Sequence, residues 1–304
     1  MLKTAFIVNS AAGSGRINRE WPALAALIRK KFPQSHFEFT RCPRDATGLT
    51  QRLIREGYEL IVAVGGDGTI NECVNGFFEN EALISRQTAL GVLPYGRGSD
   101  LARFLGIPKK AEAALEYLVG SNFIPLDVGK GTFASAEGKK QSRYFINIAN
   151  VGLVSHVVDS SHSTPKFLGS SISYLYGALW GALKYKACPV SYQSKTVPLL
   201  NMIIANGVYF GSGMKAAPQA KMNDGLFDII VAPKMGVFTF LRHLHRLYSG
   251  NHLKIPEIDF FREKTLSIAS VNGDKIPVEM DGDTVGFLPA TFEILPGALK
   301  FKML

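Results

Sequence analysis

One short stretch of this sequence combines the residue types that phosphate chemistry needs: Gly65, Gly66, Asp67, Gly68 and Thr69. It follows an apolar run over residues 60–64 and begins a segment with helical spacing. Glycines in such a turn let backbone N–H groups approach a phosphate, and the start of a helix adds partial positive charge. A carboxylate would repel the phosphate unless it holds Mg²⁺ directly or through water. The stretch therefore predicts a phosphate site with a metal ion.

Two further glycine-rich loops follow predicted strands. Residues 96–100 read Gly-Arg-Gly-Ser-Asp after a strand that ends at Leu93, and residues 12–15 read Ala-Gly-Ser-Gly after an apolar run over residues 5–8. Because loops that follow parallel strands meet at the carboxyl edge of the sheet, we expect all three loops to converge. The sequence has no Gly-Lys-Ser or Gly-Lys-Thr of the Walker type, which excludes a P-loop enzyme.

Further carboxylates could join Asp67 at this edge. Asp100 ends the second loop, and Asp127 ends a strand-like segment over residues 123–127. Clustered carboxylates beside phosphate loops favour Mg²⁺, although a simple turn at Asp127 is an equal alternative. Residues 279–283 read Glu-Met-Asp-Gly-Asp. That run fits either a hairpin turn or a general base for a hydroxyl nucleophile.

The elements that must position these residues alternate between strand and helix signals in the first part of the chain. Strands are predicted over residues 5–8, 36–40, 60–64 and 90–93. Helices are predicted over residues 46–55 and 69–78, and around Trp21, Leu24 and Ile28, which share one face. Such alternation indicates a parallel sheet that helices cover on both faces.

From about Phe123 onward the pattern changes to strands with few helices between them. Strands are predicted over residues 144–149, 200–205, 226–231 and 265–269, which indicates a second, β-rich domain. Apolar stretches over residues 171–185 and 237–248 interrupt it. We interpret both as helices that pack on the core, with a lipid-facing role as the alternative.

Composition limits the classes of partner. The net charge of +9 suits nucleic acid, an anionic membrane or an acidic ligand. Because the basic residues are scattered and no recognition signature accompanies them, we expect no nucleic-acid partner. No apolar run approaches the ~18 residues that span a bilayer, so we expect a soluble or peripheral protein. Three distant cysteines exclude a disulfide framework or a four-ligand zinc site and fit a reducing cytoplasm: Cys42, Cys73 and Cys188.

With these motifs the sequence resembles the bacterial diacylglycerol kinase-like lipid kinases, relatives of sphingosine and ceramide kinases with an NAD kinase-like nucleotide fold. The resemblance covers nearly the whole chain. Residues 65–71 match the family's GGDGTxN signature, and residues 9–16 and 93–103 resemble its other two loops. In the β-rich part, residues 147–152 and 218–226 match family patterns.

The resemblance implies a fold and an activity. It implies an N-terminal three-layer α/β nucleotide-binding domain over residues 1–128, to which residues 295–304 return as a strand. A C-terminal β-sandwich domain over residues 129–294 is implied to receive the lipid. The implied reaction is Mg²⁺-assisted transfer from ATP to a hydroxyl of diacylglycerol or a related lipid. It also implies a cytoplasmic protein, peripheral to the inner membrane, whose partner is an anionic membrane surface, and it leaves a homodimer open.

The resemblance also implies roles for individual residues. Ten would contact the nucleotide: Asn9, Thr40, Gly65, Gly66, Asp67, Gly68, Thr69, Asn71, Gly96 and Arg97. The carboxylate of Asp224 and the backbone carbonyls of Lys221 and Leu226 would hold a structural Mg²⁺. Asp283 would accept the proton from the lipid hydroxyl. Asp67 would act at the transferring phosphate, with Asp100 and Asp127 as supporting carboxylates.

Two residues depart from the family pattern. Arg97 stands where a threonine is usual, although a guanidinium could bind phosphate instead. Asp283 replaces a glutamate, which shortens the reach of the base by one methylene. These departures support the alternative of a non-catalytic protein of the same fold that binds lipid or nucleotide. NAD kinase-like activity is a second alternative, but the asparagine-rich motif typical of those enzymes is not found here.

Overall fold

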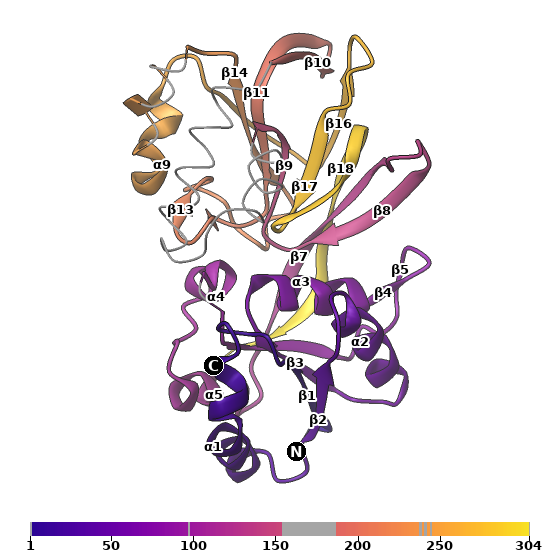
Figure 1. Cartoon of the computed structure of the whole chain (residues 1–304), viewed down its shortest axis with the longest axis vertical. Helices are drawn as coiled ribbons and strands as arrows, with labels where there is room; N and C mark the ends of the chain where they lie inside the picture. The colour runs from indigo at the N-terminus through magenta and orange to yellow at the C-terminus, as the bar shows by residue number, and fades with distance from the viewer. Residues whose placement is uncertain are drawn as a thin grey trace. The chain divides into compact units, whose positions relative to one another are not determined.

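The structure is a computed structural model, and it describes residues 2–96, 98–153, 187–236, 239, 242–243 and 245–303. The chain divides into two compact units (Figure 1). Unit 1 comprises Met1–Asp127 and Pro296–Leu304, and unit 2 comprises Val128–Leu295. The helix predicted over residues 171–185 lies outside the described residues. Within the described part of the chain, no helix is long and apolar enough to cross a membrane.

Unit 1 is built on a parallel sheet with the strand order β18-β6-β3-β1-β2. The bounds of these strands are β1 (Thr4–Asn9), β2 (His36–Thr40), β3 (Leu60–Gly65), β6 (Ala89–Pro94) and β18 (Asp283–Lys302). Only the end of β18 belongs to unit 1, where Lys300 and Phe301 lie opposite Ala89 and Leu90. Strands β3 and β6 are buried along their whole length, because helices cover both faces of the sheet.

Two layers of helices complete unit 1: α1 (Arg16–Lys31), α2 (Asp45–Arg55), α3 (Asp67–Gly76), α4 (Asp100–Phe104) and α5 (Ala111–Leu118). Figure 1 shows α1 and α5 on one side of the sheet and α2 and α3 on the other, and contacts join the members of each pair. A short hairpin of β4 (Phe78–Glu79) and β5 (Ala82–Leu83) follows α3. The predicted three-layer α/β architecture is confirmed.

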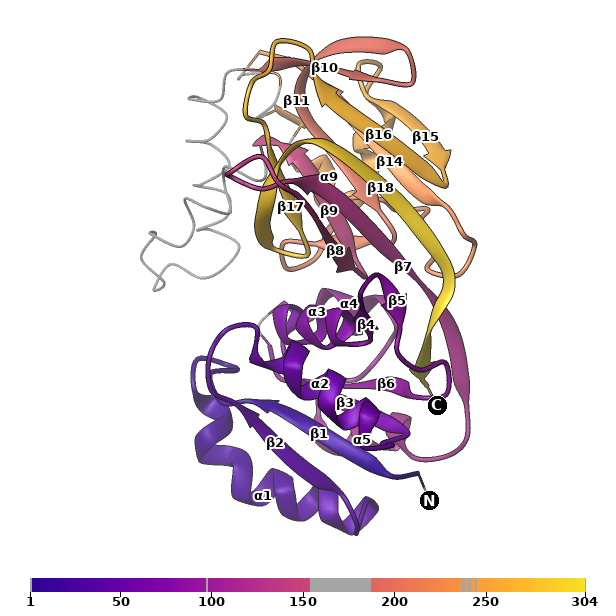
Figure 2. The same ribbon diagram turned by 90° about the vertical axis from the view of Figure 1, so that its right-hand side faces the viewer.

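Unit 2 consists mainly of antiparallel strands (Figure 2). They are β7 (Phe123–Ala134), β8 (Lys140–Phe145), β9 (Ile148–Gly152), β10 (Cys188–Tyr192), β11 (Lys195–Ala205), β14 (Phe227–Pro233), β15 (Asp259–Glu263), β16 (Thr265–Ser270), β17 (Pro277–Met280) and the first part of β18. Shorter elements are β12 (Tyr209–Phe210), β13 (Met214–Lys215), α9 (Arg246–Ser249) and η2 (Asn251–Lys254). Of the helix predicted over residues 237–248, five residues lie outside the described part and the last three form the start of α9.

Strand β11 connects the two faces of unit 2. Residues 195–199 pair with β10, and residues 201–205 pair with β9. On its other edge β11 pairs with β14, with a register shift between Leu199 and Asn201. Because β10, β16, β18, β17 and β9 also pair in turn, the strands close around a core. Phe145, Phe227 and Phe292 are fully buried in that core. The predicted β-sandwich is thereby confirmed.

Strand β7 is longer than the sequence predicts. The prediction ends a strand at Asp127, but β7 continues to Ala134 through Gly129 and Gly131. A Cβ atom on Gly129 would lie 2.3 Å from the ring of Phe145, and one on Gly131 would lie 1.8 Å from Cε of Met280. These glycines make room for large side chains on a continuous strand, and they do not mark a turn.

Candidate active site

The glycine-rich segment after β3 is joined to the loop after β1. Asn9, the last residue of β1, donates from Nδ2 to Oγ1 of Thr69 at 2.8 Å, and its Oδ1 accepts from the N–H of Ala11 at 2.9 Å. Ser10 donates to the carbonyl of Thr40, the last residue of β2, at 3.3 Å. The carboxyl ends of β1, β2 and β3 therefore meet at one edge through direct hydrogen bonds.

The first residues of the loop after β6 contact the same segment through their backbone. A Cβ atom on Gly96 would lie 2.5 Å from Cα of Gly66, and the N–H of Tyr95 donates to the carbonyl of Gly65 at 2.7 Å. Position 96 therefore requires glycine for this approach, and a Cβ atom on Gly66 would be tight, at 3.2 Å from Cα of Gly96. Gly68, in the first turn of α3, is exposed, and a Cβ atom there would meet nothing within 4 Å. The start of α3 is therefore open to a ligand.

Asp67 joins two of the loops. Its carboxylate accepts the backbone N–H of Asp100 at 3.1 Å and that of Leu101 at 3.2 Å, which caps the start of α4. A carboxylate has about four lone-pair directions, so two acceptor positions are left for a cation. The sequence predicted a metal ligand here and did not predict the cap.

The structure brings Asp67 and Asp100 together but does not bring Asp127 to them. Asp100 is buried and forms an ion pair with Arg103 at 2.5 Å. Asp127 is also buried, and its Oδ1 accepts from the N–H of Gly297 at 2.7 Å. Gly297 precedes the β18 residues that pair with the first residues of β6, so Asp127 lies at the amino edge of the sheet. The expected convergence is limited to two carboxylates.

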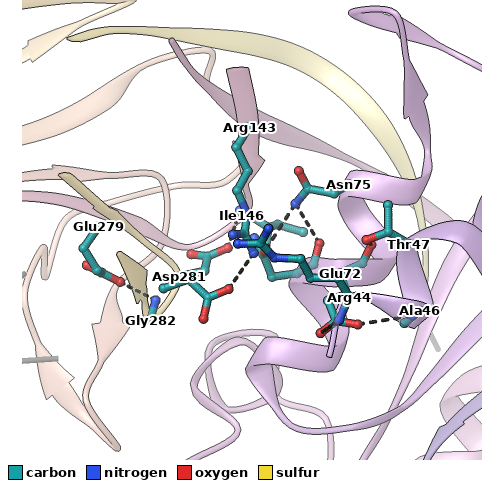
Figure 3. A network of polar contacts seen from close by, with 12 residues as sticks. Arg44, Ala46, Thr47, Glu72, Asn75, Arg143, Ile146, Glu279, Asp281 and Gly282 are labelled. Atoms are coloured by element: carbon teal, nitrogen blue, oxygen red, sulfur yellow. Dashed lines mark hydrogen bonds and ion pairs between the residues drawn. The ribbon is translucent and has the colours of Figure 1, made fainter. Parts of the chain in front are cut away.

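Helices α2 and α3 are tied together by Glu72, which the sequence analysis did not single out. Its carboxylate accepts the backbone N–H groups of Arg44 at 3.0 Å and Ala46 at 3.2 Å at the start of α2 (Figure 3). Asn71, a predicted nucleotide contact, is 2% exposed, and its carbonyl accepts from Nδ2 of Asn75 at 2.9 Å. Arg97, also a predicted contact, lies outside the described residues.

In unit 2 the turn between β17 and β18 is held by Asp281. Its carboxylate accepts three consecutive backbone N–H groups, from Ile146 at 2.8 Å, Asn147 at 3.0 Å and Ile148 at 2.9 Å (Figure 3). Asp281 has a φ of 47°, in the left-handed region that asparagine and aspartate tolerate better than most residues. Asp281 therefore anchors the turn.

Asp283 is the exposed carboxylate of this turn. Its side chain is 55% exposed and forms an ion pair with Nη2 of Arg143 at 2.6 Å. The Arg143 side chain, from β8, is only 14% exposed, so a largely buried side chain holds the exposed carboxylate. Sequence reasoning identified Asp283 and missed Arg143, which no local motif marks.

Behind the turn lies a buried polar chain. Glu279 is 3% exposed and accepts hydrogen bonds from Nδ2 of Asn150 at 2.5 Å and from the N–H of Gly282. Asn150 in turn accepts from Asn201 at 3.3 Å. Burial raises the pKa of Glu279 to about 8, because loss of hydration outweighs the two donors. The sequence signal that could have predicted this buried carboxyl is the position of Glu279 inside the otherwise apolar strand 277–280.

The loop predicted to hold a structural metal contains the carboxylate of Asp224, and the side chain of Arg262 lies beside it. Oδ1 of Asp224 accepts from the N–H of Leu226 at 3.2 Å, and Oδ2 lies 3.9 Å from Arg262. Arg262 also pairs with Oδ1 of buried Asp228 at 2.6 Å. Burial raises the pKa of Asp228, and its Oδ2 has no hydrogen-bond partner in the described part of the chain. No group of three metal-binding side chains occurs among the described residues.

Comparisons with known proteins match both units. The family described as "Diacylglycerol kinase catalytic domain" matches residues 3–131. The family described as "YegS C-terminal NAD kinase beta sandwich-like domain" matches residues 149–303. The diacylglycerol kinase of Staphylococcus aureus (strain bovine RF122 / ET3-1) is 30% identical, over 95% of this chain and 89% of its own length. That of Bacillus subtilis (strain 168) is 30% identical, over 88% and 86%.

Solved structures agree with the fold. A Bacillus anthracis str. Sterne protein superposes with a TM-score of 0.75 at 26% identity, covering 99% of this chain and 97% of its own. A second structure from that strain reaches a TM-score of 0.78 at 24% identity with the same coverage, a likeness in fold alone. With both domains matched and relatives aligned over most of its length, the chain belongs to the diacylglycerol kinase family of lipid kinases, which are phosphotransferases with an alcohol acceptor.

Proposed function

We propose that this chain transfers the γ-phosphoryl group of ATP to a hydroxyl of diacylglycerol or a related lipid, with Mg²⁺. The observation that carries the proposal is the open start of α3, where Gly68 is exposed while Gly66 and Thr69 are held by neighbouring loops. Backbone N–H groups at a helix start favour phosphate. We assign nucleotide binding to unit 1 and the lipid to unit 2.

In this proposal the phosphates lie over the start of α3. The N–H groups of Gly66 and Gly68 and the hydroxyl of Thr69 donate to phosphate oxygens. Gly65 and Gly96 allow the loops to approach, and the remaining proposed contacts are Asn9, Thr40, Asn71 and Arg97. The hydrogen bond from Asn9 to Thr69 orients that hydroxyl before the nucleotide binds, which favours a preformed site.

The carboxylates of Asp67 and Asp100 are the proposed metal-binding groups of unit 1. The acceptor positions that the α4 cap leaves on Asp67 suit a hard cation, which prefers oxygen ligands. Mg²⁺, when bound, neutralises charge on the transferring phosphoryl group. Asp127 lies at the other edge of the sheet, so we assign it only to the hydrogen bond with Gly297.

A structural Mg²⁺ in unit 2 is also part of the proposal. The carboxylate of Asp224 and the backbone carbonyls of Lys221 and Leu226 would hold it. The chemistry fits, because Oδ2 of Asp228 is a second, buried oxygen donor without a partner in the described part of the chain. In the structure, the positive charge beside the carboxylates of Asp224 and Asp228 comes from Arg262.

Asp283 is the proposed general base. Its exposed carboxylate accepts the proton of the lipid hydroxyl as that oxygen attacks phosphorus in line. Arg143 orients the carboxylate, and Asp281 fixes the turn that carries it. In the ion pair, Oδ2 of Asp283 faces Arg143. Rotation of the Asp283 side chain away from Arg143 would also free this oxygen to accept the proton of the lipid hydroxyl.

The test is phosphate transfer from labelled ATP with Mg²⁺ to a panel of lipids in mixed micelles. Asp67→Ala and Asp283→Ala should each lower the rate by about 10²- to 10⁴-fold. The matched control is Asp259→Ala. Like Asp283, Asp259 is a partly exposed aspartate in an ion pair, here with Nζ of Lys195 at 2.9 Å from its Oδ2. This substitution should leave the rate unchanged.

Three other outcomes would contradict the proposal. Nucleotide binding without turnover on any lipid would favour a non-catalytic protein. Phosphorylation of NAD and of no lipid would favour NAD kinase-like activity. Full activity in Asp283→Ala would remove Asp283 from its proposed role.

A further inference from the structure

The side chain of Glu279 has no part in the proposed function, although it lies directly behind the turn that carries Asp283. It belongs to β17, where it is 3% exposed between the fully buried Val278 and Met280. A carboxyl group in such surroundings loses its hydration, so stability alone would favour an apolar side chain of similar size. The contacts that Glu279 makes indicate what it contributes instead.

The turn between β17 and β18 has two central residues with positive φ. Met280 pairs with Asp283, and between them Asp281 has a φ of 47° and Gly282 a φ of 95°. Positive values at both positions are typical of a type I′ turn, whereas a type II′ turn has positive φ only at the first. The two types differ in the orientation of the peptide group that joins the central residues. That orientation sets the direction in which the chain enters Asp283.

Glu279 holds this peptide group. The N–H of Gly282, which belongs to it, donates to Oε1 of Glu279 (Figure 3). Oε2 of Glu279 accepts from Nδ2 of Asn150 at 2.5 Å, and Asn150 lies opposite Glu279 in the paired strand β9. The sheet therefore fixes the position of the acceptor. Asp281 anchors the same turn separately, through the N–H groups of residues 146–148.

We propose that Glu279 is a positioning residue for the transfer reaction, because its hydrogen bond to the N–H of Gly282 fixes the turn in the form that directs the Asp283 carboxylate to the lipid hydroxyl. This inference rests on the proposed function, in which Asp283 accepts the proton. Proton abstraction needs hydrogen-bond distance, so a small displacement of the carboxylate slows the step. Since nucleotide binding is assigned to unit 1, loss of the Gly282 contact should lower kcat and leave the KM for ATP unchanged.

The experiment compares Glu279→Leu with Glu279→Gln. Leucine is close to glutamate in size but accepts no hydrogen bond, so kcat should fall roughly 10- to 100-fold at an unchanged KM for ATP. Glutamine keeps an acceptor oxygen for the N–H of Gly282. Burial raises the pKa of Glu279 to about 8, so the side chain is largely uncharged at pH 7, and glutamine reproduces that charge. Glu279→Gln should therefore keep most of the wild-type kcat at pH 7.

Two controls separate positioning from general damage to the fold. Ile268→Ala removes a buried side chain of β16 in the same unit, where Ile268 pairs with Ala290 and not with the turn. It should lower the melting temperature without lowering kcat. Hydrogen exchange of the Gly282 amide, followed by NMR, reports the contact without catalysis. Exchange should be faster in Glu279→Leu than in Glu279→Gln or wild type.

Several results would overturn the inference. Wild-type kcat in Glu279→Leu, while Asp283→Ala is inactive, would remove Glu279 from this role and leave the proposed function intact. Equal losses of kcat in Glu279→Leu and in either Glu279→Gln or Ile268→Ala would also reject positioning by the acceptor oxygen, and so would unchanged exchange of Gly282 in Glu279→Leu. Full activity in Asp283→Ala would contradict the proposed function itself, and the positioning role would fall with it.

Discussion

At the scale of single residues, a substitution at Gly68 can test the effect on folding stability separately from the effect on ligand binding. It lies inside α3, is exposed, and has open space where a side chain would begin. Gly48 has the same properties inside α2, away from the proposed phosphate site. Replacing an exposed helical glycine by alanine stabilises a helix by about 0.5–1 kcal/mol. The two positions therefore form a matched pair.

We expect Gly68→Ala to raise the free energy of unfolding and to weaken ATP binding, because the new methyl group occupies the space proposed for phosphate. Gly48→Ala should give the same gain in stability and leave ATP affinity unchanged. Urea unfolding and calorimetry measure the two quantities. Equal ATP affinity in both variants would argue against phosphate binding at the start of α3.

Glu279 predicts a pH dependence. Its pKa in the folded chain, about 8, lies above the ordinary carboxyl value of 4.5, so its ionisation is opposed only in the folded state. The folded chain is favoured while the carboxyl keeps its proton, and this contribution is lost as pH rises from about 4.5 through about 8. Each pKa unit corresponds to about 1.4 kcal/mol, so the total is a few kcal/mol.

Glu279→Gln removes this titration. Relative to wild type, the variant should gain stability from pH 5 to about pH 8 in urea unfolding experiments, and the gain should level off above that pH. Glu257→Gln, which removes an exposed carboxyl of the same unit, provides the comparison. A constant difference between Glu279→Gln and wild type across this range would mean that Glu279 is already ionised at pH 5.

At the scale of elements, the sequence predicted best those strands and helices whose position depends on their own local pattern. The apolar run predicted as a strand over residues 60–64 lies in β3. The glycines that follow this run lie at the start of α3, as expected. Periodicity could not reveal that β7 passes through two glycines, because the reason lies in Phe145 and Met280 across the fold. The early end predicted for that strand left two alternatives for Asp127, a carboxylate beside the glycine loops or a simple turn.

Contacts between distant elements were the least predictable part of the candidate site. Residue type and spacing identified Asp67 and Asp283, but not their partners. The cap that Asp67 provides for α4 and the ion pair of Asp283 with Arg143 join segments 33 and 140 positions apart. Single-sequence patterns describe local periods, so pairings over such separations need the tertiary structure.

At the scale of the whole molecule, removal of Mg²⁺ tests the metal loop of unit 2. Ligands that bind the folded state alone raise its stability, so Mg²⁺ should increase the melting temperature and EDTA should reverse the increase. Asp224→Asn should abolish most of this response. Asp274→Asn, at an aspartate in the exposed segment before β17, should retain it. An equal response in both variants would place the stabilising metal elsewhere.

Strand β18 carries Asp283 at its first residue and, near its other end, pairs with β6 at the sheet edge of unit 1. During synthesis on a ribosome, this strand is made after every other strand of either unit. Until then β6 has an unpaired edge, which is the kind of surface that invites aggregation. A product cut off before residue 283 would lack both the proposed base and that edge strand. Quality-control proteases would therefore encounter an incomplete lipid kinase as an unfinished sheet, and not as a folded protein that is merely inactive.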